Sequence, residues 1–448
     1  MRVPALLTVN PELQRNLWLE LSATRLVAMP VALAVLLGGA YAIADAETAV
    51  SATRFVLAAL LLFWGSRLAA DGFGEEVTTR TWDNQRLSAA SAWSMTLGKL
   101  AGGTSYVWYG ALFCALALAA FGAPDVPALL AANLVAGLVA QGTALLTALV
   151  LHQFSPGSRR GQTTIAQLAG FVCGLSALQS VAIPTARTVA TASVATTTWY
   201  GVNWDNNGFV LVNLVLLALW LGLGVGRSIR REFGHADGPL GWTLFTLYAV
   251  LFMLGFTPEQ SVESRIAGWF ATAALTAGVL TYGGLLVTPA SPIGLKRLVA
   301  AAQAGRGLDA WRSLPMWVPS AAATVIGVVG FVATLFLTAA SKPEPLLPVA
   351  ALGFLVRDIA IVYLVRLVWK RRTLIALVIL FGLLYGILPA LFRASELSLV
   401  RELFLPIPQH WSPGQPSGVG FGAILPWLEA AAVLAALWRR LQPRPSPP

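Results

Sequence analysis

The chain has 448 residues, of which 57% are hydrophobic and only 11% are charged. Soluble globular domains carry about 25% charged residues, so this composition excludes an ordinary soluble protein. The formal net charge is +10. That charge is compatible with a nucleic-acid partner or with a membrane protein, and the positions of the basic residues decide between the two.

The first predicted element is an amphipathic helix in the N-terminal segment, residues 1–25. Asn10 is a good N-cap residue, and Pro11 suits the first helical position. Leucines recur at every fourth position with Trp18 beside them, and charged residues fall largely on the other side. Because the segment adjoins the first apolar run, we expect the helix to lie in the inner membrane interface rather than to be an ordinary solvated helix.

Twelve apolar runs follow, each of about 20 residues and long enough to cross a hydrocarbon core of about 30 Å. They cover residues 26–43, 52–70, 99–122, 126–151, 163–185, 208–228, 240–257, 264–288, 316–340, 346–368, 373–393 and 419–438. They lack the two-residue alternation of a barrel strand, so they are predicted to be helices. The sequence therefore predicts an all-α integral membrane protein with about twelve transmembrane helices.

The basic residues are distributed asymmetrically about these runs. With the N-terminus inside, most of the 30 Lys and Arg residues fall in inner segments or at inner span ends, and the outer segments hold few. This is the positive-inside pattern. It predicts a multi-pass protein of the cell membrane with both termini in the cytoplasm. The basic charge thus indicates topology and not a nucleic-acid partner.

The connections between the runs repeat along the chain. Long and short loops fall in the same order twice, with the long ones at residues 71–98 and 186–207, then at 289–315 and 394–418. This pattern predicts two six-helix halves with parallel topology, covering 26–234 and 235–448.

The sequence contains no motif for catalysis, nucleotide binding or metal binding. His152, His235 and His410 are far apart, and no P-loop is present. Cys114 and Cys173 fall inside predicted spans and are interpreted as buried, inert thiols. We therefore expect no enzymatic activity, no cofactor and no metal in this chain.

Charged residues inside spans are costly and are candidates for function. Arg357 and Asp358 lie in the tenth run, and neighbours on a helix point about 100° apart, so they need not pair with each other. Glu429 in the twelfth run is the predicted partner of Arg357. Two interpretations stay open, a transport role and a charge pair that fixes helix packing.

The inner loop after the second run carries the polar segment "TWDNQRLSAASAW", residues 81–93. It lacks Gly and Pro, which favours a surface helix. Trp82 and Trp93 recur at helical spacing and can contact the membrane or other span ends. Asp83 and Arg86 are then left to face outward. On these residues alone, a solvated helix without a partner is the simpler interpretation.

This segment resembles the inner-loop motif of the permease subunits of ABC exporters of the second type, the drug, polysaccharide and natural-product exporter class. The residues that fall on the motif without a gap are Thr81, Asp83, Ser88, Ser91, Trp93, Gly98, Lys99 and Leu100. Glu75 and Glu76 precede it. Two departures are Ala89 in place of Pro and the polar Asn84-Gln85-Arg86 in place of apolar residues.

The resemblance implies an N-terminal elbow helix and a helix that couples to a separate cytoplasmic ABC ATPase subunit. The implied coupling residues are Thr81, Trp82, Asp83, Arg86, Ser88, Ser91, Trp93 and Lys99. It also implies export across a bacterial inner membrane. The second half is then a diverged second permease unit or an accessory bundle, and in the latter case the chain pairs with itself or with a second permease chain.

Two other functions stay open from the sequence. Twelve spans in two sets of six also suit a secondary transporter, although the loop "DGFGEEVTTRTW" after the second run lacks a Gly-Asp-Arg-type signature. A membrane scaffold without transport activity is the third possibility. The sequence does not identify the substrate.

Overall fold

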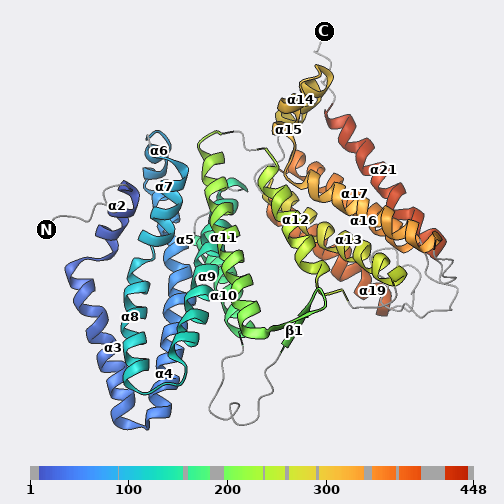
Figure 1. Cartoon of the computed structure of the whole chain (residues 1–448). Helices are drawn as coiled ribbons and strands as arrows, with labels where there is room; N and C mark the ends of the chain where they lie inside the picture. The colour runs from blue at the N-terminus through green and yellow to red at the C-terminus, as the bar shows by residue number, and fades with distance from the viewer. Residues whose placement is uncertain are drawn as a thin grey trace. The chain divides into compact units, whose positions relative to one another are not determined.

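The computed structural model describes residues 10–88, 90–154, 160–181, 196–235, 238–257, 262–288, 292–337, 346–369, 373–394 and 419–441. Nearly all of these residues are helical (Figure 1). The chain divides into two compact units. The first comprises residues 1–198 and 202–237, and the second comprises residues 199–201 and 238–448. The sequence pattern places the boundary between the halves after residue 234.

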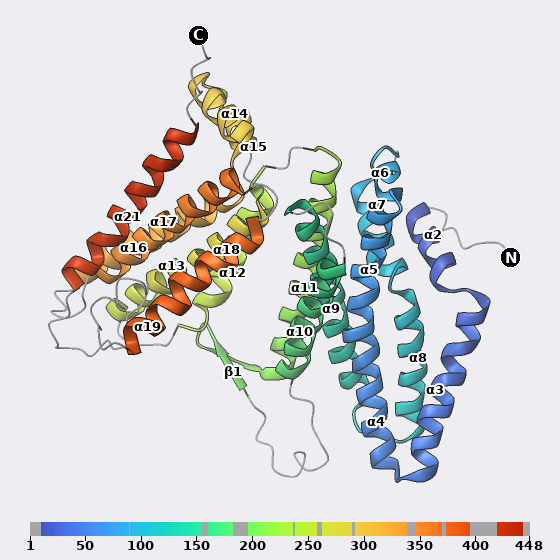
Figure 2. The ribbon, with the colours of Figure 1, turned by 180° about the vertical axis from the view of Figure 1, so that it is seen from behind.

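The first unit is a helix bundle preceded by a short N-terminal helix. Its helices are α2 (Pro11–Glu20), α3 (Ala23–Ile43), α4 (Ala46–Ala58), α5 (Gly65–Thr78), α6 (Thr81–Arg86), α7 (Ala92–Leu97), α8 (Ser105–Ala120), α9 (Val126–Phe154), α10 (Arg160–Ser180) and α11 (Asn206–Glu232), with π-helical stretches η1 (Ala59–Trp64) and η2 (Gly98–Gly102). Helices α3, α8 and the continuous α4–α5 segment run side by side in both views (Figures 1 and 2).

Helix α2 begins where the sequence predicts. The Asn10 side chain accepts hydrogen bonds from the backbone N–H groups of Glu12 and Leu13, and Pro11 occupies the first turn. The apolar core of the bundle includes Leu57, Leu61 and Cys114, all fully buried or nearly so. Burial of Cys114 agrees with the sequence-based interpretation, whereas Cys173 on α10 is exposed and corrects it. Membership of an apolar run does not reveal which face of a helix points away from the bundle.

The second unit is also a bundle of apolar helices. It contains α12 (Leu240–Leu254), α13 (Val262–Val287), α14 (Pro292–Gln303), α15 (Gly307–Ser313), α16 (Trp317–Leu337), α17 (Leu346–Val368), α18 (Thr373–Gly382), η3 (Leu383–Ile387), α19 (Leu388–Ala394) and α21 (Val419–Leu441). Helices α13 and α16 pack closely at Gly327, where an added Cβ would lie 2.7 Å from the backbone N of Ala274.

A short hairpin precedes α11. Its strands are β1 (Thr196–Trp199) and β2 (Val202–Asp205), joined through Tyr200 and Gly201, both at positive φ, as a type I′ turn requires. Trp199 and Tyr200 donate to the carbonyl oxygens of Phe252 and Leu251, at 2.9 and 2.7 Å. They supply partners to the last turn of α12, whose carbonyls have none within the helix.

Seven helices in the described part of the chain are long and apolar enough to cross a membrane, or eight if the bent pair Ala92–Gly102 and Ser105–Ala120 is one span. The seven are Ala23–Ile43, Ala46–Thr78, Val126–Gln153, Asn206–Glu232, Ser264–Val287, Trp317–Leu337 and Pro348–Val368. Two further apolar helices, Leu240–Leu254 and Ala376–Phe392, are shorter. The chain is therefore an all-α, multi-pass membrane protein. Residues 182–185 and 338–340, at the ends of two predicted spans, lie outside the described residues.

Candidate functional site

The polar segment after the second span forms two short helices, α6 and α7, and not the single helix that the sequence predicts. Serine side chains explain the break. Ser88 Oγ donates to the carbonyl of Gln85 and accepts from the backbone N–H of Ala90, and Ser91 caps α7 by accepting from the N–H of Ser94. Such local bonds compete with helical backbone bonds, so the chain turns between residues 87 and 91. Ala89 lies outside the described residues.

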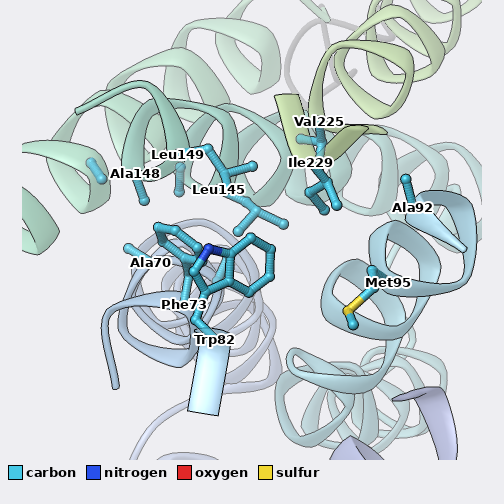
Figure 3. Packing of buried hydrophobic residues seen from close by; sticks show 13 residues of the cluster. Ala70, Phe73, Trp82, Ala92, Met95, Leu145, Ala148, Leu149, Val225 and Ile229 are labelled. Carbon is cyan, nitrogen blue, oxygen red and sulfur yellow. The ribbon is translucent and has the colours of Figure 1, made fainter. Parts of the chain in front are cut away.

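Trp82 anchors α6 in the core of the first unit. Its side chain is only 2% exposed and packs edge to face against Phe73 of α5, with ring centroids 5.2 Å apart. Figure 3 shows both rings pointing toward Leu145 and Leu149 of α9. Ile229 of α11 belongs to the same cluster. The sequence left Trp82 either on the membrane or against the ends of other spans, and the structure packs it against other helices.

Asp83 and Arg86 lie on the outer side of α6. Their side chains are 67% and 42% exposed, and their charged atoms are 4.0 Å apart, which is a weak surface pair. Ser88 and Ser91 are also exposed, although both take part in the local turn. Thr81 is half-buried and donates to the carbonyl of Glu76, so it links α6 to α5.

Trp93 lies on α7 at the edge of the bundle. It is partly exposed, and its indole lies against Gly226 of α11, where an added Cβ would be 2.8 Å from the ring. The residue therefore holds α7 to α11 and leaves one side of the ring open. Helix α6 therefore presents an exposed polar side, whereas α7 exposes the apolar side chains of Trp93 and Leu97.

Lys99 does not belong to either exposed side. The resemblance assigns it to the coupling residues, but its side chain is buried, forms an ion pair with Glu76 and lies 3.4 Å from Glu12. Its ammonium also lies 5.1 Å from the centroid of the Trp82 ring. Arg15 pairs with both Glu12, at 3.2 Å, and Glu76. We call Glu12, Arg15, Glu76 and Lys99 the inner ion cluster.

The inner ion cluster joins α2, α5 and η2, and Gln85 of α6 donates to Glu76 at 3.1 Å. The sequence predicts that the charged side of α2 lies opposite its apolar side, and it indicates no partner for the charged residues. The structure buries Glu12 and Asn16 of that side against η2, because Gly98 and Gly102 allow the two helices to approach closely. The absence of side chains at Gly98 and Gly102 was the available signal in the sequence.

A second buried cluster lies in the second unit. Arg357 Nη1 lies 2.7 Å from Glu429 Oε2, the partner expected from the sequence, and Arg357 Nε donates to Asp358 Oδ1 at 3.0 Å. The adjacent residues therefore do pair, because the long guanidinium reaches round the helix to the neighbouring carboxylate. Asp358 is fully buried, whereas the Glu429 side chain is 33% exposed.

Two tyrosines complete this cluster. Tyr282 of α13 donates to Asp358 at 2.8 Å, Tyr385 of η3 also donates to Asp358, and Arg357 Nη2 donates to the Tyr385 hydroxyl at 2.7 Å. We call Arg357, Asp358, Glu429, Tyr282 and Tyr385 the intramembrane cluster. It joins four helical elements of the unit. Neither tyrosine stands out in the sequence, since both lie in ordinary apolar runs.

The carboxylates of both clusters are engaged with cations, with an amide or with hydroxyl groups. In the described residues, no group of three or more His, Cys, Asp or Glu side chains is placed to hold a metal ion. Comparisons with models of protein families, with curated proteins and with solved structures found no match for this chain.

Proposed function

We propose that the chain is the permease subunit of an ATP-driven ABC exporter and that a separate cytoplasmic ATPase subunit binds at α6 and α7. The proposal includes twelve spans in two six-helix halves, an inner location for α2 as an elbow helix, and both termini in the cytoplasm of a bacterial cell. The ungapped motif between Thr81 and Leu100 supports it, together with the multi-pass helical fold.

The observation that carries the proposal is the construction of α6. Its outer side presents Asp83 and Arg86, while Trp82 on its inner side is locked among α5, α9 and α11. A partner that pushes on the outer side therefore moves the ends of three span-forming helices together. A stiff, anchored helix of this kind converts partner binding into a change between two arrangements of the spans.

The second unit offers a weaker counterpart. Helix α15 lies in the corresponding inner loop, but no side chain of α15 is buried. Leu308 and Trp311 of α15 are exposed, in contrast to Trp82 of α6. Of the two short helices compared, α6 is anchored and α15 is not, which favours an assembly in which the chain pairs with a second permease chain.

The test is reconstitution with an ABC ATPase subunit from the source organism. The full chain is co-expressed with that ATPase, and the complex and its ATP turnover are measured after purification. We expect the double reversal Asp83→Lys with Arg86→Glu to weaken the complex at least about tenfold, because like charges then face each other across the contact. The control is the reversal of Arg67 and Asp71, a second exposed Arg–Asp pair in the same unit.

An intact complex with unchanged ATP turnover after the reversal at positions 83 and 86 would remove the coupling role from α6. Transport that survives ATP depletion but collapses with the proton gradient would identify a secondary transporter instead. If neither transport nor an ATPase partner were found, a membrane scaffold without transport activity would be the remaining function.

A further inference from the structure

A cavity of about 250 Å³ lies in the first unit between α2, α5 and η2. Arg15, Leu19 and Glu20 line it from α2, and Leu68 and Glu75 line it from α5. Helix α2 ends at Glu20, and the first apolar helix, α3, begins directly after the connecting turn. The cavity therefore lies where α2 meets the start of the first span, at the surface of the membrane.

Helix α2 carries exposed apolar side chains next to this cavity. Trp18 is 72% exposed and Leu19 beside it is also exposed, although both are apolar. Tryptophan is enriched at the level of lipid headgroups, because its ring is apolar and its N–H is polar. Leu19 also lines the cavity, so the cavity wall continues onto this exposed apolar surface.

The charges that line the cavity do not cancel. Arg15 is paired within the inner ion cluster, and Glu20 accepts from Arg25 Nη1 at 2.8 Å. In the described part of the chain no ion pair includes Glu75, which is exposed at the cavity wall. One carboxylate of the cavity is thus uncompensated.

Glu20 and Glu75 also influence each other. Burial raises the pKa of Glu20 above its ordinary value, Arg25 opposes this rise, and the charge of Glu75 adds to it. A cation placed between the two carboxylates would relieve this repulsion. The cavity therefore favours a positively charged group, and an apolar wall at Leu19 and Leu68 accompanies it.

We propose that this cavity binds the headgroup of an aminophospholipid, with its ammonium between Glu20 and Glu75 and its phosphate toward the Arg15 guanidinium. A primary ammonium offers three N–H donors, which suit two carboxylates and the neighbouring Thr79 hydroxyl. A choline headgroup carries the same charge but has no N–H donor. The site therefore distinguishes phosphatidylethanolamine from phosphatidylcholine. This inference depends on the membrane fold and not on the proposed ATPase partner.

The first experiment needs no variant. The purified full-length chain in detergent is titrated with dioleoyl phosphatidylethanolamine, its N-methyl and N,N-dimethyl derivatives, and dioleoyl phosphatidylcholine. Bound lipid is counted by native mass spectrometry. We expect affinity to fall along the methylation series, by on the order of tenfold from ethanolamine to choline, because charge-assisted hydrogen bonds are lost. Equal affinity across the series would overturn the proposal.

The second experiment locates the site. We expect Glu75→Gln to abolish the preference for ethanolamine over choline. The thermal midpoint without added lipid should not fall, because Glu75 has no described ion pair to lose and its repulsion of Glu20 is removed. The matched control is Glu47→Gln, an exposed carboxylate in the first turn of α4, which should keep the preference. Retention of the preference in Glu75→Gln would overturn the assignment. So would competition by free ethanolamine as strong as that of the lipid, since the ligand would then be a soluble amine.

Discussion

Lys99 and Arg357 are the buried cations in the described part of the chain, and they are compensated in different ways. Lys99 is shared between Glu12 and Glu76, on η2, α2 and α5. Arg357 lies within an apolar helix, where an unpaired charge is much more costly. Its guanidinium contacts two carboxylates and a tyrosine hydroxyl and also lies over the Phe354 ring, 4.7 Å from the centroid.

Removal of Arg357 should therefore destabilise the second unit strongly. We expect Arg357→Gln to cost about 3–5 kcal/mol, because it leaves Asp358 buried without its cation. Glu429→Gln should act in the same direction but by less, since that side chain is partly exposed and glutamine still accepts from Arg357. Thermal midpoints of the purified chain measure both, with Asp83→Asn on the protein surface as the control. An innocuous Arg357→Gln would show that the cluster does not hold the packing.

At the scale of elements, α2 is held to the bundle by close approach as well as by charge. An added Cβ at Gly98 would lie 2.5 Å from Glu12 Cγ and 2.9 Å from the backbone N of Leu13. At Gly102 it would lie 2.8 Å from Asn16 Cβ. Two glycines on one face of η2 thus leave the space that the α2 backbone fills.

Gly98→Ala should therefore separate α2 from η2. Backbone cannot give way as a flexible side chain does, so we expect a loss of about 1–3 kcal/mol from overpacking. Gly39→Ala is the matched control, because nothing lies within 4 Å of an added Cβ at that position of α3. That substitution should leave the thermal midpoint unchanged or raise it slightly through helix propensity. Equal midpoints for the two variants would contradict close packing of α2 on η2.

At the scale of the whole molecule, the loops that hold α6 and α15 are separated by six predicted spans. With this even number of crossings both loops are predicted to lie on the same side of the membrane, and the asymmetry of the basic residues predicts that this side is the cytoplasm. If α12, which has 15 residues, did not cross the membrane, each later span of the second unit would cross it in the opposite direction to the one predicted.

Labelling of single cysteines tests this topology. In a chain whose Cys114 and Cys173 are replaced by Ala, we expect Ser88→Cys and Arg306→Cys to react with a membrane-impermeant thiol reagent only from the cytoplasmic side. Glu47→Cys, in the predicted outer turn, should react only from the other side. All three positions are exposed in the structure, so access depends on topology. Reaction of positions 88 and 306 from opposite sides would exclude the six-plus-six arrangement.

The sequence by itself determined the class of the protein, the places of its apolar helices and the candidate pairing of Arg357 with Glu429. These follow from properties of short segments, because hydropathy over about 20 residues decides whether a segment can cross a bilayer, and an intramembrane charge calls for a partner of opposite sign. The N-terminal helix could also be predicted from the sequence, because its N-cap residue and its leucine repeat are local features.

Only the tertiary structure decided which polar residues face inward. It buried Lys99 with Glu76, turned the chain between α6 and α7, and brought Tyr282 and Tyr385 to Asp358. Each of these depends on residues far apart in the chain or on competition between serine side chains and the helical backbone. Segment composition does not encode such choices, because the free energy of burying a charge or a hydroxyl depends on the partner that packing places beside it.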